Sequence, residues 1–255
     1  MKLVVVAFEN FPEVDSSSNL AETILQSASE NEWDWKDGDI LILAQKIVSK
    51  AENRFINLKD VKPGDLAKKY AHITGKDPRL VELILRESSK ILRTRNGLII
   101  VQHKLGFICA NAGIDHSNVR GDAGEYQNVV LLLPENPDKS ASLIRSQIYK
   151  SIKKNIGVII IDSHGRPWRK GVVGVSIGMS GVPPVIDRRG SSDRFGYKLK
   201  ITEIGVADEL AATASLLMGQ ADEGRPVVVL RGFPYQLEEG QISDILRKES
   251  EDLFR

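Results

Sequence analysis

The stretch GVIIIDSHGRPWRKG, residues 157–171, places an apolar run directly before a cluster of ionisable side chains. Val158 to Ile161 are continuously apolar, which predicts a strand that is buried on both faces of a sheet. Asp162 follows at once, so we expect its carboxylate at the carboxyl end of this strand, where open sheets commonly present groups to a ligand. Taken alone, an aspartate in such a place is more often the cap of a turn or helix.

The residues after Asp162 suit the binding of a cation and of anionic groups. Ser163 adds a hydroxyl oxygen, and a hydroxyl beside a carboxylate is a pair of hard oxygen ligands that Mg²⁺ or Mn²⁺ accepts. The same turn carries His164, Arg166, Arg169 and Lys170. These side chains either form a solvated run of charge or bind the phosphate or carboxylate groups of a ligand.

Length, composition and charge narrow the class of protein. The chain has 255 residues, is 42% hydrophobic and carries 35 basic and 34 acidic side chains, for a net charge of +1. The composition is typical of a globular protein. The small net charge produces no overall electrostatic attraction to nucleic acid or to a membrane surface. The apolar runs are too short for a signal peptide or a membrane span, so we expect a cytoplasmic protein.

A single cysteine, Cys109, limits the redox and metal chemistry of the chain. It excludes an intramolecular disulfide, a CxxC pair and a cysteine-rich zinc site. We expect it to be a small buried side chain in a reducing compartment.

Further apolar runs and helical patterns predict a central sheet with helices around it. The runs are Leu3–Phe8, Asp39–Ala44, Leu98–Gln102, Val129–Leu133 and Val227–Leu230. Helices are predicted at Leu20–Ala28 after the cap Asn19, at Arg79–Ser88 after Asp77 and Pro78, and at Ala207–Met218 before Gly219. The glycine-rich stretch Gly171–Gly190 is predicted to be loop and irregular strand, and the charged tail after Glu238 a solvated helix.

Three other segments hold candidate ligands for a nucleotide or a metal. In NAGIDHSNV (111–119), Asp115 and Asn118 are three residues apart and would project to one side of a tight turn, while His116 is expected at the surface. In MGQADEGR (218–225), the Gln220 carbonyl, the loop amides and Arg225 could complete a nucleotide site. Read alone, these are an Asx turn and an ordinary helix–loop–strand connection.

The third segment is AQKIVSKAENR (44–54), which follows the predicted strand Asp39–Ala44. Lys46 and Lys50 lie one helical turn apart and could both reach a polyphosphate, although exposed lysines usually bind nothing specific. The GxxxxGK[ST], GxGxxG, GxSxG and HExxH motifs are all missing from the sequence. The common nucleotide-binding and hydrolase scaffolds are therefore disfavoured.

With these segments identified, the chain resembles the coenzyme F420-0:gamma-glutamyl ligase family. The resemblance is carried by GDILILAQKIVSKAENR (38–54), CANAGIDHSNV (109–119), IIIDSHGRPWRKGVVGVSIGMSG (159–181) and ITEIGVADELAATASLLMGQADEGRPVVVLRG (201–232). They occur in the family order and cover nearly the whole chain. We therefore expect a ligase without the nitroreductase-like extension of two-domain relatives.

The resemblance implies a GTP-dependent ligase that joins L-glutamate to F420-0 through an acyl phosphate. It implies two divalent cations, Mg²⁺ or Mn²⁺, and a possible activating K⁺. The expected fold is α+β, with mixed sheets and flanking helices in two intertwined lobes, and residues 1–255 form one ligase unit that acts as a homodimer. The substrates would be F420-0, L-glutamate and GTP.

The resemblance also assigns roles to individual residues. Asp115 and Asp162 match the ligands of one metal, and Ser163 and Gln220 those of the other. Asn118 matches a GTP contact. The other residues that match nucleotide-binding segments are Phe11, Pro12, Glu13, Val14, Gln45, Lys46, Lys50, Met218, Gly219, Gln220, Ala221, Asp222, Glu223, Gly224 and Arg225. Asp162, Arg166 and Arg169 are the predicted catalytic residues, with the two arginines binding acidic groups of the substrate.

Three positions depart from the family pattern. Ser163 stands where threonine is frequent, and serine keeps the hydroxyl oxygen that would bind the metal. Gln45 and Lys46 replace small hydroxyl residues in a nucleotide-binding segment, so the nucleotide could be either GTP or ATP. Three other functions fit the same residues: a regulatory protein that binds nucleotide and metal, a metal-dependent phosphohydrolase, and a ligase that acts on another carboxylate.

Overall fold

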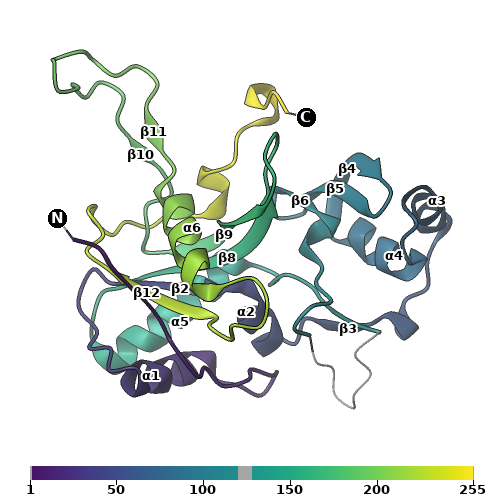
Figure 1. The fold of residues 1–255 in the computed structure, drawn as a ribbon, viewed down its shortest axis with the longest axis horizontal. Coiled ribbons are helices and arrows are strands. Elements are labelled where there is room, and N and C mark those ends of the chain that lie inside the picture. The colour runs from purple at the N-terminus through teal and green to yellow at the C-terminus, as the bar shows by residue number, and fades with distance from the viewer. Residues whose placement is uncertain (1, 120–127, 255) are drawn as a thin grey trace.

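The computed structural model describes residues 2–119 and 128–254, and its main feature is a mixed five-stranded sheet (Figure 1). In spatial order the strands are β1 (Val4–Ala7), β12 (Val227–Arg231), β2 (Ile40–Ala44), β8 (Gly157–Gly165) and β9 (Val172–Ser180). Strands β2 and β8 are parallel, and the other neighbours are antiparallel. Strands β1 and β12, from opposite ends of the chain, are therefore hydrogen-bonded neighbours in one sheet.

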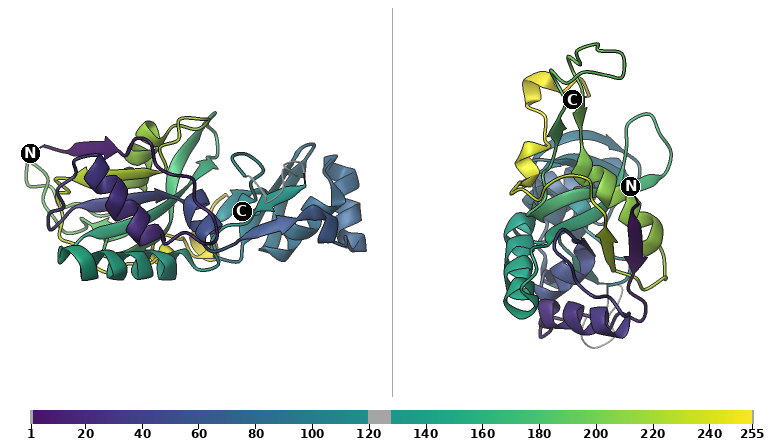
Figure 2. Two further views of the ribbon diagram at one scale, coloured as in Figure 1. Left: turned by 90° about the horizontal axis from the view of Figure 1, so that it is seen from below. Right: turned by 90° about the vertical axis from the view of Figure 1, so that its left-hand side faces the viewer.

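The continuous apolar runs are buried on both faces of this sheet, as the sequence predicts. Leu41 and Leu43 pack on one face with α1 (Leu20–Glu30) and α5 (Pro137–Ile152). The alternate residues of the same strand pack on the other face with α6 (Val206–Met218). Figure 2 shows α5 and α6 on opposite sides of the sheet. Three layers of helix, sheet and helix thus enclose the core.

The prediction of loop and irregular strand for Gly171–Gly190 is wrong in its first half, because β9 is a regular strand of the central sheet. Its glycines make room for helices on both faces. A Cβ on Gly174 would lie 2.6 Å from the Ala211 carbonyl oxygen in α6. A Cβ on Gly178 would lie 2.5 Å from the Pro137 carbonyl carbon in α5. Here glycine serves close packing of helix on strand.

The second half of that stretch opens a long arm. Strands β10 (Ile186–Asp187) and β11 (Glu203–Ile204) pair at its base. The chain between them extends away from the sheet, as Figure 1 shows. Phe195 and Ile201, in this segment, are 93% and 88% exposed.

The three predicted helices are confirmed. Asn19 accepts a hydrogen bond from the Glu22 N–H at the start of α1, and α6 ends at Gly219. Asp77 caps α4 (Pro78–Arg86). The other three described α-helices were not among these predictions: α2 (Gln45–Ala51), α3 (Asp65–Thr74) and α5. The start of α5 is nevertheless marked by the Asn-Pro pair at residues 136–137, a recognised start signal.

The tail after Glu238 is not the predicted helix. It forms two short 3₁₀ turns, Ile242–Asp244 and Glu249–Glu251. Ile242 is buried in the core, and its N–H donates to the Asp138 carboxylate at the start of α5. This tertiary anchor holds the chain in a conformation that a solvated helix would not allow. Among the described residues, no helix has the length and apolar character of a membrane span.

A second group of elements lies beside the central sheet. It contains a three-stranded sheet of β4 (Ser88–Arg95), β5 (Leu98–His103) and β6 (Ile108–Ala110), covered by α3 and α4. The pair β3 (Phe55–Asn57) and β7 (Val129–Leu131) lies next to it, and 3₁₀ turns follow β3 and β6 at Leu58–Asp60 and Asn111–Gly113. The predicted mixed content of helices and several sheets is confirmed. Two intertwined lobes, a single unit over residues 1–255 and a homodimer stay predictions.

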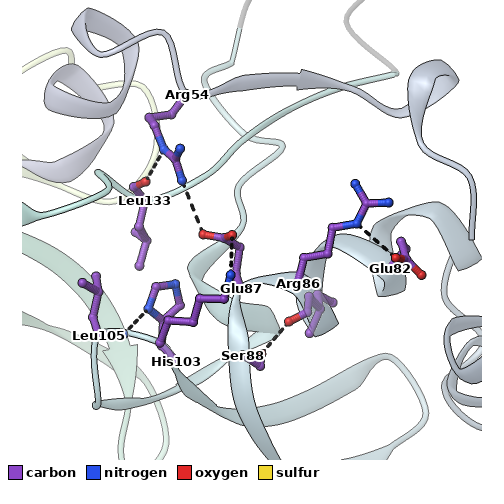
Figure 3. Close-up of polar contacts among 10 residues, drawn as sticks. Arg54, Glu82, Arg86, Glu87, Ser88, His103, Leu105 and Leu133 are labelled. Atoms are coloured by element: carbon purple, nitrogen blue, oxygen red, sulfur yellow. Dashed lines mark hydrogen bonds and ion pairs between the residues drawn. The ribbon is translucent and has the colours of Figure 1, made fainter. Parts of the chain in front are cut away.

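Polar contacts tie this group to the rest of the chain (Figure 3). Arg54 Nε donates to the Leu133 carbonyl oxygen at 2.9 Å, and its Nη2 lies 3.4 Å from a Glu87 carboxylate oxygen. Lys104 Nζ lies 3.8 Å from the same carboxylate. Next to this cluster, His103 is 3% exposed and accepts from the Leu105 N–H through Nδ1. Its Nε2 therefore carries the proton, and this buried atom has no hydrogen-bond partner among the described residues.

The buried His103 predicts a loss of stability in mild acid. Burial lowers its pKa from 6.5 to about 4, and the charges of Lys104, His164 and Arg54 act in the same direction, against Asp162. The unfolded chain takes up the proton first, so stability is lost as the pH falls from 6.5 toward 4. Because His103 is protonated more readily in the unfolded chain, we expect the free energy of unfolding to be about 3 kcal/mol lower at pH 4 than at neutral pH.

Urea denaturation of the wild-type protein and of His103→Gln between pH 7.5 and 4 measures this effect. The wild-type stability should fall more steeply with acid than that of the variant. Parallel pH profiles would show that His103 does not titrate as its burial implies.

Candidate active site

A cleft of about 440 Å³ lies where β2 meets α2 (Gln45–Ala51) and α6 runs into β12. Five separate parts of the chain form its walls, which brings together segments that the sequence marks as candidates. The predicted nucleotide-binding residues all line it: Phe11, Pro12, Glu13, Val14, Gln45, Lys46, Lys50, Asn118, Met218, Gly219, Gln220, Ala221, Asp222, Glu223, Gly224 and Arg225. Asp162 and Ser163 line it as well. Their assigned roles stay predictions.

The strand that carries Asp162 is longer than predicted. Strand β8 continues to Gly165, with Asp162 opposite Val175 of β9, so this carboxylate is not at the end of its strand. The parallel neighbour β2 does end here, because its last residue, Ala44, is opposite Ile161. Strands β8 and β9 run on as a two-stranded hairpin past the edge of the sheet. The Asp162 side chain is therefore 13% exposed at the cleft wall, with Oδ2 3.2 Å from His164 Nε2.

Ser163 contacts Gln220, as expected of two residues that share a site. The Ser163 hydroxyl donates to the Gln220 side-chain oxygen at 2.7 Å, across 57 positions of sequence. Gln220 reaches this place because α6 ends at Gly219, which has φ 74°. Since side chains alternate along a strand, Ser163 and Asp162 leave β8 on opposite faces. The strand thus presents one oxygen-bearing side chain on each of its faces.

Asp115 faces the start of α2. It is not in a helical turn but bridges to Leu131, and its Oδ2 accepts from Gln45 Nε2 at 2.7 Å and from Lys46 Nζ at 2.6 Å. Burial raises the pKa of this carboxyl, and the negative charge of Asp162 adds to the rise, while Lys46 opposes it. Two carboxylates are therefore close enough to repel each other, with one ammonium beside them.

The second lysine of α2 also has a carboxylate partner. Lys50 is 7% exposed and forms an ion pair with Glu13 in the segment after β1. Both lysines thus lie on the cleft wall at helical spacing. Binding of a polyphosphate by them stays a prediction.

The loop between α6 and β12 is shaped by its own hydrogen bonds. Asn118, with φ 57°, donates from Nδ2 to the Ala221 carbonyl oxygen at 2.8 Å. The Glu223 carboxylate accepts from the Ala221 N–H at 2.8 Å, and bonds to the N–H groups of Ala221, Glu223 and Gln220 hold its pKa below the usual range. Several N–H groups of the loop therefore converge on one anionic group.

Some predicted residues are not brought into the cleft. Arg166 and Arg169 lie in or next to the turn that joins β8 to β9, beyond the described residues that line the cleft. The reason is the continued pairing of β8 with β9, which carries the turn away from the sheet edge. Ser215, on α6, lines the cleft but was not predicted, because a serine within a helical pattern gives no local signal.

The donor atoms that gather here suit a hard cation. Among the residues that the structure describes, no group of three or more His, Cys, Asp or Glu side chains has the arrangement of a metal site. Of the four predicted oxygen ligands, Asp162, Ser163 and Gln220 line the cleft, whereas Asp115 is not among its described lining residues and instead contacts Gln45 and Lys46, which are. All four are oxygen ligands, the kind that Mg²⁺ and Mn²⁺ prefer.

Comparisons with known proteins agree over most of the chain. The sequence model of the F420-0:Gamma-glutamyl ligase family matches residues 10–232. A protein of Methanothermobacter thermautotrophicus named Coenzyme F420:L-glutamate ligase is 44% identical over 257 residues, which cover 100% of both chains. Proteins of the same name from Methanopyrus kandleri and Archaeoglobus fulgidus are 46% and 39% identical, over 95% and 100% of this chain and 93% and 97% of their own.

Proposed function

The chain belongs to the F420-0:gamma-glutamyl ligase family, and from this we propose that it is a GTP-dependent ligase that joins L-glutamate to coenzyme F420-0. The observation that supports the site most directly is the contact of Ser163 with Gln220 in a cleft that Asp162 also lines. Ser163 and Gln220 come together there across 57 positions of sequence, beside a loop whose N–H groups bond to the carboxylate of Glu223.

Amide formation from a carboxylate requires a better leaving group than hydroxide. In the proposed reaction a carboxylate oxygen of F420-0 attacks the γ-phosphorus of GTP, and GDP leaves with the electrons of the broken bond. The glutamate nitrogen then attacks the acyl carbon, inorganic phosphate leaves, and the nitrogen loses a proton to form the amide. The protein mainly has to align the reactants and offset negative charge.

The residues of this chain divide that work. Lys46 and Lys50 lie one turn apart on the cleft wall, where their charges favour phosphate groups once they exchange their present carboxylate partners. The N–H groups of the loop 218–225, which bond to the Glu223 carboxylate, would bind a phosphate once that carboxylate moves aside. We propose that Asp115, Asp162, Ser163 and Gln220 hold divalent ions. A bound Mg²⁺ or Mn²⁺ supplies positive charge against the transferred phosphoryl group, and K⁺ is a candidate activator.

Product analysis tests the proposed function. Purified protein is incubated with F420-0, GTP, L-glutamate and MnCl₂, and the products are examined by mass spectrometry. We expect F420-0 to gain a glutamyl residue, with phosphate release that requires both acceptor and amine. Phosphate release without glutamate would indicate a phosphohydrolase, and GTP binding without turnover would indicate a regulatory protein.

The hydroxyl at position 163 gives a graded test of the same site. Ser163→Thr keeps the oxygen that contacts Gln220, so we expect kcat to stay within about threefold of the wild type, whereas Ser163→Ala should lower it at least about tenfold. Steady-state kinetics with saturating GTP and Mn²⁺ compare the two variants. Equal losses in both would mean that packing around the β8 side chain, and not its oxygen, is what matters.

We also propose that two copies of the chain associate. The arm between β10 and β11 exposes Phe195 and Ile201 well away from the core, and such apolar side chains are typical of surfaces that another chain covers. The mass in solution, measured by light scattering, tests for the homodimer.

A further inference from the structure

The turn between β8 and β9 carries an unusual tryptophan. Trp168 is 89% exposed and has φ 64°, in the left-handed region that bulky side chains rarely adopt. Residues held in such conformations cluster at sites that bind ligands, where the strain is part of the function. The ring has one aromatic neighbour in the described chain, Phe254, at 6.2 Å between centroids. A large planar face is thus presented at the tip of the hairpin.

A second, independent feature of the same hairpin indicates an anionic ligand. Arg166 Nη1 is buried and has no hydrogen-bond partner among the residues that the structure describes. A buried guanidinium nitrogen is rarely left unpaired, because its desolvation is unfavourable unless an acceptor is supplied. Arg169 and Lys170, both exposed, add positive charge to the same turn.

The hairpin connects this turn directly to the cleft. Asp162 and His164 point to the same face of β8, since residues two apart in a strand do so, and Arg166 follows directly after the strand ends at Gly165. Three residue steps separate Asp162 from Gly165, so the turn begins roughly 10 Å beyond Asp162 along the backbone, at about 3.3 Å per residue. Free glutamate is too short to extend from the cleft to Trp168.

We propose that Arg166 and Trp168 form a binding subsite for an elongated acceptor substrate that carries an anionic group and, farther along, a planar aromatic ring system. Arg166 binds the anionic group, and the ring stacks on the exposed indole, while the reacting carboxylate lies in the cleft. The subsite rests on the proposed ligase function, whose acceptor it specifies. It makes the β8–β9 hairpin the element that selects the acceptor, and the cleft the element that binds the nucleotide.

Calorimetric titration tests the subsite without requiring turnover. The probes are F420-0, the acceptor of the proposed reaction, and 2-phosphoglycolate, a phosphorylated carboxylate without a ring. We expect Trp168→Ala to raise the Kd for F420-0 about tenfold, in the range of aromatic stacking, and to leave that for 2-phosphoglycolate unchanged. Trp168→Phe should recover most of the affinity. Arg166→Met should weaken the binding of both probes.

Kinetic constants supply the second readout and the control. Trp168→Ala should raise KM for F420-0 and leave KM for GTP and for glutamate as in the wild type. Tyr149→Ala removes another exposed aromatic ring, on α5, and should change neither binding nor kinetics. An unchanged Kd for F420-0 in Trp168→Ala, or no binding of F420-0 by the wild type, would overturn the subsite. Trp168-dependent binding without amide formation would overturn the ligase proposal and leave the subsite standing.

Discussion

Replacement of Asp162 by asparagine is expected to lower kcat/KM for glutamate ligation about 1000-fold, because a ligand charge worth several kcal/mol in the transition state is lost. The side chain keeps its size, and the contact at 3.2 Å with His164 can persist as a neutral hydrogen bond. The fold should therefore survive. In the proposed site, the neutral amide would hold a divalent ion less well than the carboxylate does, and the ion would then offset less of the charge of the transferred phosphoryl group.

Kinetics with F420-0, GTP and glutamate measure the effect, and thermal melting confirms the folded state. Asp187→Asn is a suitable control, since Asp187 is an exposed carboxylate on β10 that is not among the described residues of the cleft. Its activity should match the wild type. Activity of Asp162→Asn within tenfold of the wild type would contradict the proposed role of Asp162 as a metal ligand.

Gly178→Ala should destabilise the protein by about 3 kcal/mol, at the upper end of what overpacking usually does. The added Cβ would lie 2.5 Å from the Pro137 carbonyl carbon and 2.8 Å from the Asp138 nitrogen. These are backbone atoms at the start of α5. They cannot turn aside as a flexible side chain would, so helix and sheet have to separate.

Urea denaturation of Gly178→Ala and of Gly165→Ala forms a matched comparison on the same pair of strands. A Cβ on Gly165 meets no atom within 4 Å, so that variant should be as stable as the wild type or slightly more stable. Equal stability of the two variants would contradict the packing of α5 on β9 described above.

The central strands and three helices could be predicted because their signals are local. The apolar runs of β2, β8 and β12 are continuous, and a run of this kind is buried on both faces wherever it lies in the sheet. Strand β9 could not be predicted from the same rule. Gly174 and Gly178 lower the apparent strand propensity of the stretch, and their reason for being there is a helix on each face, far away in sequence.

The candidate site divides in a similar way. The chemistry of their side chains makes Asp115, Ser163 and Gln220 possible ligands on sequence alone. The contact of Ser163 with Gln220 cannot be predicted in this way, because it depends on where α6 ends and how β12 enters the sheet. Only the resemblance to a family paired them in advance. Closeness to Asp162 in sequence suggests that Arg166 and Arg169 lie at the cleft. In the structure the hairpin of β8 and β9 carries them past the edge of the sheet.

The position of β12 between β1 and β2 has a consequence for how the chain folds during synthesis. Val4 is the partner of Arg231, so the amino-terminal strand has no neighbour until almost the entire chain has left the ribosome. A contact across so many residues closes late and slows folding. A nascent chain that stops at α6 lacks β12, so the apolar strands β1 and β2 have no partner strand between them. We expect such a truncated product to be bound by chaperones or degraded by proteases.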